Sequence, residues 1–306
     1  MKLSVVISSY NGAKNIEEQL NSLRLQTRLA DEVLICDDGS TDGTVKIVSD
    51  FISSYELQNW KLIINESNKG WRKNFIDGIS MSNGDLIFTC DQDDIWRHDK
   101  LEVMEKIMCE HSEINLLVTN YLEFYEDGKE KVGTRANNKE LEKVKIKNNF
   151  LSVESPGCVY CFRRELFDLA LPYWFEGYAH DELLWRVALF TDTLYFYHDD
   201  LIKWRKHYDS AFSKEARELK TKENKEKWLE FNCKVMDTLD ELIKHVSTDT
   251  KKQRKVLKRN RKCFELRKKF YKTGNIFTGL HLMEYWDCYP RYRQYPADWY
   301  LIFIKH

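Results

Sequence analysis

Short strand-like runs alternate with longer helical runs over the first hundred residues. The strand-like runs are rich in Val, Ile, Leu and Cys, and they cover Leu3 to Ser8, Val33 to Cys36, Lys61 to Ile64 and Asp85 to Cys90. Between the first two runs, Ile16, Leu20 and Leu23 recur at helical spacing. This alternation predicts βαβ units, and therefore an α/β fold in which helices wrap a mostly parallel sheet. In such a fold the ligand crevice lies at the carboxyl ends of the strands.

Polar residues follow three of these strands at the point where each one ends. The three polar segments are Ser8 to Gly12, Asp37 to Thr44 and Asp91 to Asp94. Because the carboxyl ends of parallel strands meet at one edge of a sheet, we expect these segments to form a single site. Neither G-x-G-x-x-G after the first strand nor the P-loop pattern G-x-x-x-x-G-K-[ST] occurs in the sequence. A phosphate bound at this edge therefore needs another partner.

The acidic segment after the fourth strand supplies a candidate for that partner. In an extended strand, residues two positions apart point to the same face, so Asp91 and Asp93 should converge while Gln92 and Asp94 point the other way. Convergent carboxylates and substrate phosphates are the usual ligands of Mg²⁺ and Mn²⁺. The alternative is an acidic turn that caps a helix beginning near His98.

Four motifs follow one another within the first hundred residues. They are the segments 8–20 (SSYNGAKNIEEQL), 37–44 (DDGSTDGT), 68–75 (NKGWRKNF) and 91–96 (DQDDIW). Together they resemble glycosyltransferase family 2, and more narrowly its bacterial rhamnosyltransferase-like branch. The resemblance continues more loosely to about residue 210, through the segments 155–166, 179–186 and 203–211.

The resemblance implies a GT-A fold and a nucleotide-diphosphate sugar as donor, either dTDP-rhamnose or a UDP-sugar. It also implies a divalent cation, Mn²⁺ or Mg²⁺, and inversion at the anomeric carbon. The acceptor would be a saccharide or a lipid-linked saccharide in bacterial cell-surface polysaccharide synthesis. The processive members carry a Q-x-x-R-W segment that this chain lacks, so we expect transfer of a single sugar.

The resemblance also assigns the nucleotide-binding residues. One of Asp37 and Asp38 contacts the base or the ribose, and the sequence does not separate them, although we favour Asp38. Ser9 and Asn11 line the nucleotide, and Asp91 contributes to both the nucleotide and the metal site. Without the resemblance, these residues would be read as turn and helix-capping residues.

The remaining roles concern catalysis. The resemblance places Asp181 as the base that takes the proton of the acceptor hydroxyl. The branch usually has an aromatic pair after this Asp, so Glu182 stands as a competing base. Gly157 falls in a segment similar to the acceptor-side strand. His207 is predicted as a third metal ligand or a diphosphate contact, and Arg205 as a partner of the leaving group; otherwise both are surface residues.

The charge divides the chain into two parts. Residues 1–213 hold 25 basic and 36 acidic residues, whereas residues 214–306 hold 23 and 13. The change in charge predicts a separate C-terminal helical extension over residues 214–306. Within the first part, the resemblance implies a nucleotide-sugar-binding half over residues 1–100 and an acceptor-side half over 101–213.

Two features of the extension favour a membrane surface as its partner. Lys251 to Lys272 holds twelve basic residues, and nine aromatic residues follow it between Thr273 and His306. A basic helix followed by aromatic residues predicts attachment to an anionic membrane surface. Alternatively, these helices pack on the catalytic part or on a second copy of the chain. The oligomeric state is left open.

Composition and pattern exclude several classes of protein. With 42% hydrophobic residues over 306 positions, the chain can bury a full core, which excludes intrinsic disorder. No apolar run approaches eighteen residues, and strand-like residues begin at Leu3. We therefore expect a cytoplasmic protein, peripheral on the inner face of the membrane.

Two other functions would use parts of the same sequence. A nucleotidyltransferase would usually show a glycine-rich and basic loop after its first strand, and Ser8 to Gly12 holds no basic residue. A nonenzymatic membrane or nucleic-acid binding protein would leave the acidic strand ends without a purpose. No nucleic-acid module is visible, so we expect no nucleic-acid partner.

Overall fold

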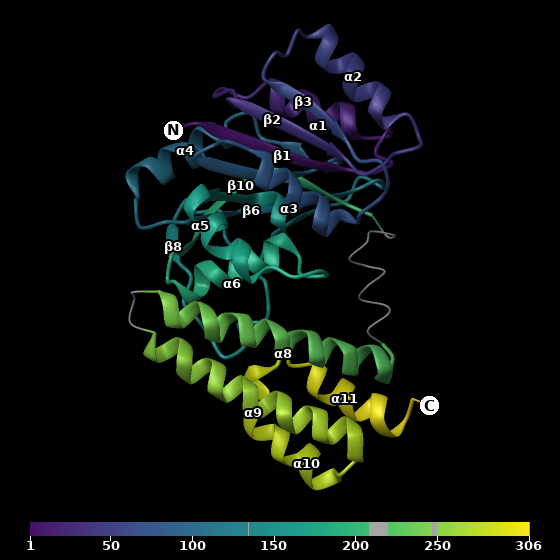
Figure 1. Ribbon diagram of the computed structural model, residues 1–306, viewed down its shortest axis with the longest axis vertical. Coiled ribbons are helices and arrows are strands. Elements are labelled where there is room, and N and C mark those ends of the chain that lie inside the picture. Colours follow the sequence, from purple (N-terminus) through teal and green to yellow (C-terminus); the bar gives the residue numbers. More distant parts are fainter. Residues whose placement is uncertain (134, 208–219, 247–249, 306) are drawn as a thin grey trace. The chain divides into compact units, whose positions relative to one another are not determined.

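The computed structural model describes residues 1–133, 135–207, 220–246 and 250–305, and it divides into two compact units (Figure 1). The sheet unit comprises residues 1–144, 155–188 and 193–206, and the helical unit comprises residues 145–154, 189–192 and 207–306. The boundary predicted at residue 213 lies outside the described residues.

Among the described residues, ten strands form one mixed sheet. The strands are β1 (Leu3–Ser9), β2 (Glu32–Asp37), β3 (Trp60–Ile64), β4 (Leu86–Asp91), β5 (Ile95–Trp96), β6 (Leu116–Tyr125), β7 (Glu130–Val132), β8 (Leu141–Lys143), β9 (Tyr160–Arg163) and β10 (Leu194–Lys206). Their order is β3-β2-β1-β4-β9-β6-β10-β5, with β7 on β6 and β8 on β10. β1 runs parallel to β2 and β4, β2 to β3, and β10 to β6, whereas β9 is antiparallel to both of its neighbours. The predicted α/β fold with a sheet wrapped by helices is confirmed.

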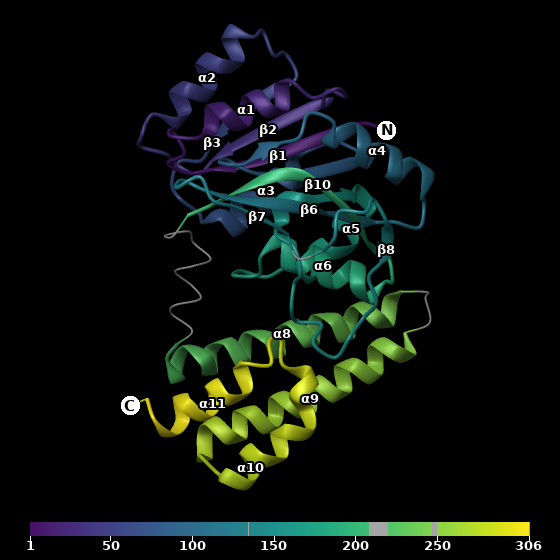
Figure 2. The ribbon, with the colours of Figure 1, turned by 180° about the vertical axis from the view of Figure 1, so that it is seen from behind.

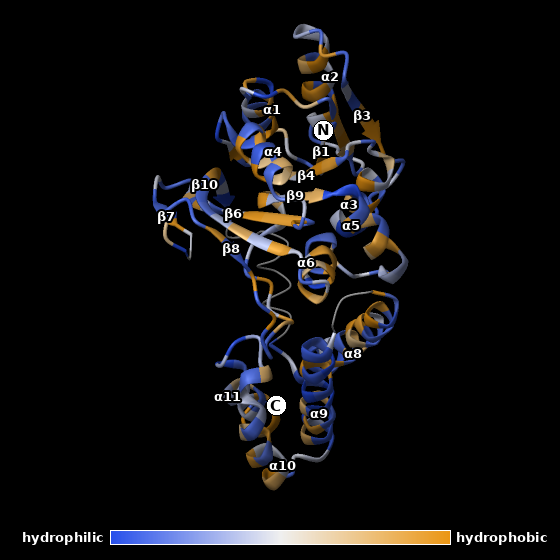
Figure 3. Cartoon of the chain, turned by 90° about the vertical axis from the view of Figure 1, so that its left-hand side faces the viewer, coloured by the Kyte–Doolittle hydropathy of each residue, from blue (hydrophilic) through white to orange (hydrophobic). Residues whose placement is uncertain are grey.

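Helices cover both faces of this sheet, as opposite views show (Figures 1 and 2). The helices of the sheet unit are α1 (Ile16–Arg24), α2 (Thr44–Ser54), α3 (Trp71–Met81), α4 (Lys100–Glu110), α5 (Arg164–Ala170) and α6 (His180–Phe190, which ends in the helical unit), with short 3-10 turns η1 (Gly157–Val159) and η2 (Leu171–Tyr173). α1 and α4 lie on one face, and α3, α5 and α6 lie on the other (Figure 3).

The sheet core follows from the apolar strand runs. Val5, Ile7, Val33 and Phe88 are fully buried, and Figure 3 shows hydrophobic residues concentrated along the central strands. α3 approaches the sheet closely because it carries Gly78. A Cβ atom on Gly78 would lie 2.7 Å from a side-chain atom of β1 and 2.8 Å from one of β2. Glycine at this position therefore lets α3 pack directly on β1 and β2.

The helical unit contains α8 (Lys222–His245), α9 (Lys251–Thr273), α10 (Ile276–His281), the 3-10 segment η3 (Leu282–Cys288) and α11 (Gln294–Phe303). The predicted C-terminal helical extension is therefore confirmed. Apolar residues of the basic helix α9, such as Val256, Leu257 and Phe264, face inward. A buried ion pair between Arg267 and Asp298 ties α9 to α11, with 2.9 Å between Nε and Oδ2. Among the described residues, none of the helices is both long and apolar enough to cross a bilayer.

Candidate active site

Strand register brings the three polar segments to one edge of the sheet. Ser9 on β1 lies opposite Asp37 on β2, and Ser8 lies opposite Asp91 on β4. The loop after β1 is joined to the segment after β4, because the Gln92 side chain accepts a hydrogen bond from Tyr10 N at 2.8 Å and donates one to Tyr10 O at 3.1 Å. The sheet therefore presents these polar groups as one connected site.

Asp37 organises the loop that follows β2. Its two carboxylate oxygens accept hydrogen bonds from the hydroxyls of Ser9 (3.2 Å) and Ser40 (2.5 Å) and from the backbone N–H groups of Gly39 (3.1 Å) and Ser40 (2.8 Å). A carboxylate accepts about four hydrogen bonds. The acceptor capacity of Asp37 is thus filled within the protein by four donors that include the Ser9 hydroxyl. The predicted contact of Ser9 with the nucleotide stays a prediction.

Among the described residues, Asp38 accepts one hydrogen bond fewer than Asp37. Its Oδ1 accepts from the Asn65 side chain at 3.0 Å and from Lys69 N at 2.9 Å, and its Oδ2 accepts from Gly70 N at 2.8 Å. These are three described donors against a capacity of about four, so one acceptor position of Oδ2 is not filled by the described residues, and the side chain is 1% exposed. The sequence does not decide which of Asp37 and Asp38 contacts the nucleotide. Because Asp38 accepts one hydrogen bond fewer within the described residues, we continue to favour Asp38.

Asn11 links two of the edge loops. Its backbone lies in the left-handed region, with φ of 48°, which Asn tolerates better than most residues. Asn11 N donates to the Ser40 hydroxyl at 2.8 Å, and its Oδ1 accepts from Thr41 N at 2.9 Å. Asn11 is exposed, so it lies where a ligand at this edge could reach it.

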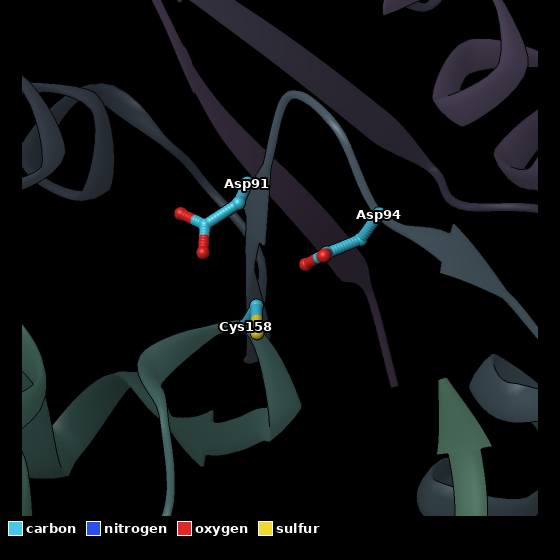
Figure 4. Close-up of side chains that lie close together, drawn as sticks. All are labelled: Asp91, Asp94 and Cys158. Atoms are coloured by element: carbon cyan, nitrogen blue, oxygen red, sulfur yellow. The ribbon is translucent and has the colours of Figure 1, made fainter. Parts of the chain in front are cut away.

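The acidic segment after β4 is arranged differently from the prediction. Side-chain atoms of Asp91, Asp94 and Cys158 lie within 4.8 Å of one another (Figure 4). The predicted orientation of Asp94, away from Asp91, is wrong. β4 ends at Asp91 and a turn follows, so the alternation of an extended strand does not continue to Asp94.

Burial and neighbouring negative charges raise the pKa values of this group of carboxyls. Loss of hydration on burial, followed by the charges of Asp93 and Asp181, raises the pKa of Asp91 to about 7. Burial and then the charges of Asp91 and Asp93 raise the pKa of Asp94 well above its ordinary value. Asp94 is fully buried, and its Oδ2 has no hydrogen-bond partner among the described residues. A site with an excess of negative charge and an unpaired carboxylate oxygen suits a divalent cation.

The donor atoms also fit a hard cation. Asp91 and Asp94 supply carboxylate oxygens in this group, which Mg²⁺ and Mn²⁺ prefer. The sequence predicted that Asp93 would converge with Asp91, but Asp93 is not among the three described residues whose side-chain atoms lie within 4.8 Å of one another, although its charge acts on Asp91. The sulfur of Cys158 is a softer donor than a carboxylate oxygen, and Mg²⁺ and Mn²⁺ bind it less readily. The residues present therefore fit the predicted metal through their carboxylates.

Lys100 lies beneath this group of carboxyls. Its ammonium group is fully buried, donates to Cys158 O at 2.8 Å and lies 3.7 Å from the centre of the Trp96 ring. Burial lowers its pKa to about 8, and its positive charge opposes the raised pKa of Asp91. No sequence pattern marks Lys100 as part of the site, because a lysine in the first turn of a helix ordinarily points to solvent.

Arg205 holds the acidic segment from β10. Its Nε donates to Asp93 O at 2.7 Å, its backbone N donates to Asp94 Oδ1 at 3.0 Å, and its Nη2 donates to Glu18 at 2.6 Å. These contacts join Arg205 to the acidic segment and to α1, and its predicted role as a partner of the leaving group stays a prediction. His207 follows the end of β10 and belongs to the helical unit, so its place as a metal ligand remains a prediction.

Asp181 lies in the first turn of α6. It contributes to the raised pKa of Asp91, so the two carboxyls lie within electrostatic range. Burial raises the pKa of Asp181, which Glu182 N, Arg186 and Arg72 partly oppose. Glu182 instead pairs with the buried Arg186 at 3.1 Å. Arg72, at the start of α3, was not included among the predicted site residues, and only the motif 68–75 pointed to it.

Gly157 lets α6 approach η1. A Cβ atom on Gly157 would lie 2.8 Å from His180 Nε2 and 3.0 Å from Asp181 Cβ. Gly157 O also accepts a hydrogen bond from the Thr89 hydroxyl at 2.7 Å, so η1 is held to β4 and cannot move away freely. The absence of a side chain at this position therefore sets the place of Asp181.

We expect Gly157→Ala to lower kcat while the protein stays folded. The added methyl group must displace the start of α6, and a displacement of about 1 Å at a catalytic group costs on the order of 100-fold in rate. Transfer kinetics together with a thermal melt check this. A variant with the wild-type kcat would show that the position of Asp181 does not depend on Gly157.

We expect the buried His180 side chain to make the protein less stable at acidic pH. Its ring is 2% exposed, stacks 4.0 Å from the Phe75 ring centre, and has no described partner for either nitrogen. Burial lowers its pKa to about 3, so the unfolded chain binds one more proton between that pH and about 6.5. Stability contributed by neutral His180 is full above pH 6.5 and falls as the pH drops toward 3.

Thermal melts between pH 7.5 and 4.5 test this expectation. The wild-type protein should lose more stability on acidification than His180→Leu, which removes the titrating group at similar volume. Parallel pH profiles for the two proteins would contradict the assignment of His180 as a buried neutral ring.

The sequence is similar to several known glycosyltransferases. The sequence model of the family described as "Glycosyl transferase family 2" matches residues 4–168. The chain is 32% identical over 164 residues to dTDP-rhamnosyl transferase RfbG of Shigella flexneri, which covers 52% of this chain and 54% of that protein. It is 33% identical over 119 residues to the Escherichia coli UDP-Glc:alpha-D-GlcNAc-diphosphoundecaprenol beta-1,3-glucosyltransferase WfgD, covering 39% and 45%.

A solved structure shares the fold. The structure of S. aureus TarS 1-349 in complex with UDP-GlcNAc superposes with a TM-score of 0.61 at 21% identity, covering 84% of this chain and 70% of that one. The matched segments of the curated relatives span between 35% and 56% of those proteins' lengths. The family match covers more than half of the chain, and it includes all three polar strand ends of the site. The chain therefore belongs to glycosyl transferase family 2.

Proposed function

We propose that this protein transfers a single sugar from a nucleotide-diphosphate sugar to a saccharide or lipid-linked saccharide, with inversion at the anomeric carbon, in bacterial cell-surface polysaccharide synthesis. The observation that carries the proposal is the group of carboxyls at the carboxyl edge of the sheet, with Asp181 in electrostatic range of Asp91. This arrangement supplies a place for a diphosphate with its cation and a base beside it.

The nucleotide lies along the ends of β1 and β2 in this proposal. Asp38 Oδ2 accepts a hydrogen bond from the base or ribose, since it retains acceptor capacity. Asn11 contacts the nucleotide, and Asp37 with Ser9 holds the loop in shape. The donor is dTDP-rhamnose or a UDP-sugar, in keeping with the names of the two relatives described above.

Asp91 and Asp93 hold Mn²⁺ or Mg²⁺ in the proposed site. Both residues are only partly buried, whereas Asp94 is fully buried. A cation that also binds substrate phosphates must be reached from solvent, so the two more accessible carboxylates suit it better. When bound, the cation supplies positive charge that stabilises the departing diphosphate.

The chain's own residues complete the reaction. The Asp181 carboxylate accepts the proton of the acceptor hydroxyl while that oxygen forms a bond to the anomeric carbon. The bond from the anomeric carbon to the diphosphate oxygen breaks, and the nucleoside diphosphate leaves. Burial raises the pKa of Asp181, which makes it a stronger base than an exposed aspartate.

A donor screen tests the proposed function. The full chain is incubated with UDP-, GDP- and dTDP-sugars, with Mn²⁺ or Mg²⁺ and with excess EDTA. We expect cation-dependent release of a nucleoside diphosphate from one donor class. Release of pyrophosphate from a nucleoside triphosphate and a sugar phosphate would instead identify a nucleotidyltransferase, and full activity in EDTA would exclude the metal.

We also propose that the protein works at the cytoplasmic face of the membrane, where a lipid-linked acceptor would be presented. The basic helix α9 supports this location, because anionic lipids attract basic segments.

A further inference from the structure

α10 and the start of η3 present a row of large apolar side chains to solvent. Ile276, Phe277, Leu280 and Met283 are 56%, 81%, 49% and 56% exposed. Their spacing places them on one side of a helical segment. We call these four residues the apolar tip.

The apolar tip is held outward by the packing of the opposite side of α10. A Cβ atom on Gly279 would lie 2.5 Å from the Trp299 ring and 2.7 Å from the Phe270 ring, so the backbone of α10 lies directly on these aromatic residues. Asn275 caps the helix by accepting a hydrogen bond from Thr278 N at 3.0 Å. The exposure of the tip is therefore a property of a fixed helix.

The surrounding surface is also unusually apolar. Nine of the eighteen exposed large hydrophobic residues in the described part of the chain lie between Ile276 and Ile304. Phe303, 42% exposed, lies at the end of α11 and approaches to 3.8 Å from the Cβ position of Gly274, just before α10. Exposed apolar patches of this kind mark a binding surface.

Positive charge flanks the tip. Lys268, Lys269 and Lys272 are exposed on the last turns of α9, which ends at Thr273, three residues before α10 starts. An apolar surface beside a cluster of lysines matches the chemistry of an anionic bilayer, in which acyl chains lie beneath lipid phosphates.

We propose that the apolar tip inserts into the interface of an anionic phospholipid bilayer, with Lys268, Lys269 and Lys272 contacting the lipid phosphates. The inference deepens the proposed location at the membrane, and it does not depend on the proposed transfer reaction. Insertion and charge together provide the two signals that stable peripheral binding requires.

The aromatic residues that the sequence suggested as anchors are divided between two roles. Tyr289 is 2% exposed, and the rings of Tyr295 and Trp299 pack against each other with 6.4 Å between their centres. Trp286 and Tyr300, by contrast, are 63% and 50% exposed. The bilayer contact therefore centres on α10, which the aromatic pattern did not single out.

Vesicle co-sedimentation of the full chain tests the proposal without donor or acceptor. We expect binding to vesicles of phosphatidylglycerol and phosphatidylcholine, little binding to phosphatidylcholine alone, and release by high salt. The double variant Phe277→Ser and Leu280→Ser should bind at least tenfold more weakly. The matched control, Leu25→Ser and Leu29→Ser, changes residues of 59% and 58% exposure on the sheet unit and should bind as the wild type does.

A second pair of variants tests the charge. Replacing Lys268, Lys269 and Lys272 with Gln should weaken binding on the order of fivefold per lysine. Replacing Lys252, Lys255 and Lys258, which are exposed on the first half of the same helix, should have a smaller effect because these residues lie farther from the tip.

Three outcomes would overturn the proposal. The first is that the full chain binds neutral and anionic vesicles equally well. The second is that the tip variant and its control lose vesicle binding to the same extent. The third is that the full chain binds no vesicles but associates with itself, and that the tip variant abolishes this self-association. The last outcome would assign the tip to contact between copies. Donor turnover by the tip variant, measured separately, keeps these results distinct from a failure of the proposed transfer reaction.

Discussion

Replacing Asp91 with Asn is expected to lower kcat/KM on the order of 100- to 1000-fold, because charge stabilisation by a catalytic metal contributes several kcal/mol and each 1.36 kcal/mol is a factor of ten. Asp91 lies opposite Ser8 at the carboxyl edge of the sheet, and its carboxyl is near both Asp94 and Asp181. The change keeps the volume of the side chain and removes its charge. Steady-state kinetics at several Mn²⁺ concentrations measure the loss.

Two neighbouring variants identify the second metal ligand. Asp93→Asn should show a loss similar to that of Asp91→Asn, whereas Asp94→Asn should lose less activity because its carboxyl is fully buried. The reverse order would assign the second ligand to Asp94. Wild-type activity in all three variants would remove the metal site from the mechanism.

Replacing Asp181 with Asn is expected to lower kcat on the order of 100- to 10,000-fold, since general base catalysis contributes about that much. Donor affinity should stay near the wild-type value, because only removal of the acceptor proton is lost. Single-turnover transfer and calorimetric binding of the donor separate the two quantities.

Glu182→Gln is the matched control for Asp181→Asn. Glu182 lies one residue later on the same helix, and its carboxylate pairs with Arg186. We expect its rate to stay within a fewfold of wild type. If Glu182→Gln loses transfer and Asp181→Asn does not, the base is Glu182.

The sequence was sufficient to predict the four strands of the first hundred residues and the α/β class of the fold, but not the antiparallel strand β9 or the remaining strands of the mixed sheet. Alternating periods predict strands and helices reliably where buried strands such as Val33 to Cys36 are bounded by polar turns. Parallel strands end at a common edge, so the polar segments were expected to meet. The register that places Ser9 opposite Asp37 and Ser8 opposite Asp91 is known only from the structure.

Contacts between distant segments were not predictable. The position of Asp94 depends on where β4 ends, and sequence patterns leave strand ends uncertain by a few residues. The buried Lys100 depends on a carbonyl at Cys158, fifty-eight residues later. Asp37 and Asp38 differ in the number of hydrogen bonds that they accept, and the donors come from loops that only the folded chain brings together.

The C-terminal region shows the same limit. Twelve basic residues between Lys251 and Lys272 predict a helix with a charged face, and α9 has that form. Which aromatic residues pack inward depends on the contact of Gly279 with Phe270 and Trp299. A pattern of charge and aromatic content carries no information about that contact.

The anomeric configuration of the product tests the central claim most directly, namely that one base, Asp181, drives a single displacement at the sugar. The donor class identified in the screen is supplied to the full chain with an acceptor, and the early product is examined by proton NMR. The account predicts one linkage, inverted relative to the donor. A product that retains the donor configuration would contradict it, because retention requires a step that a single base beside a bound diphosphate does not supply.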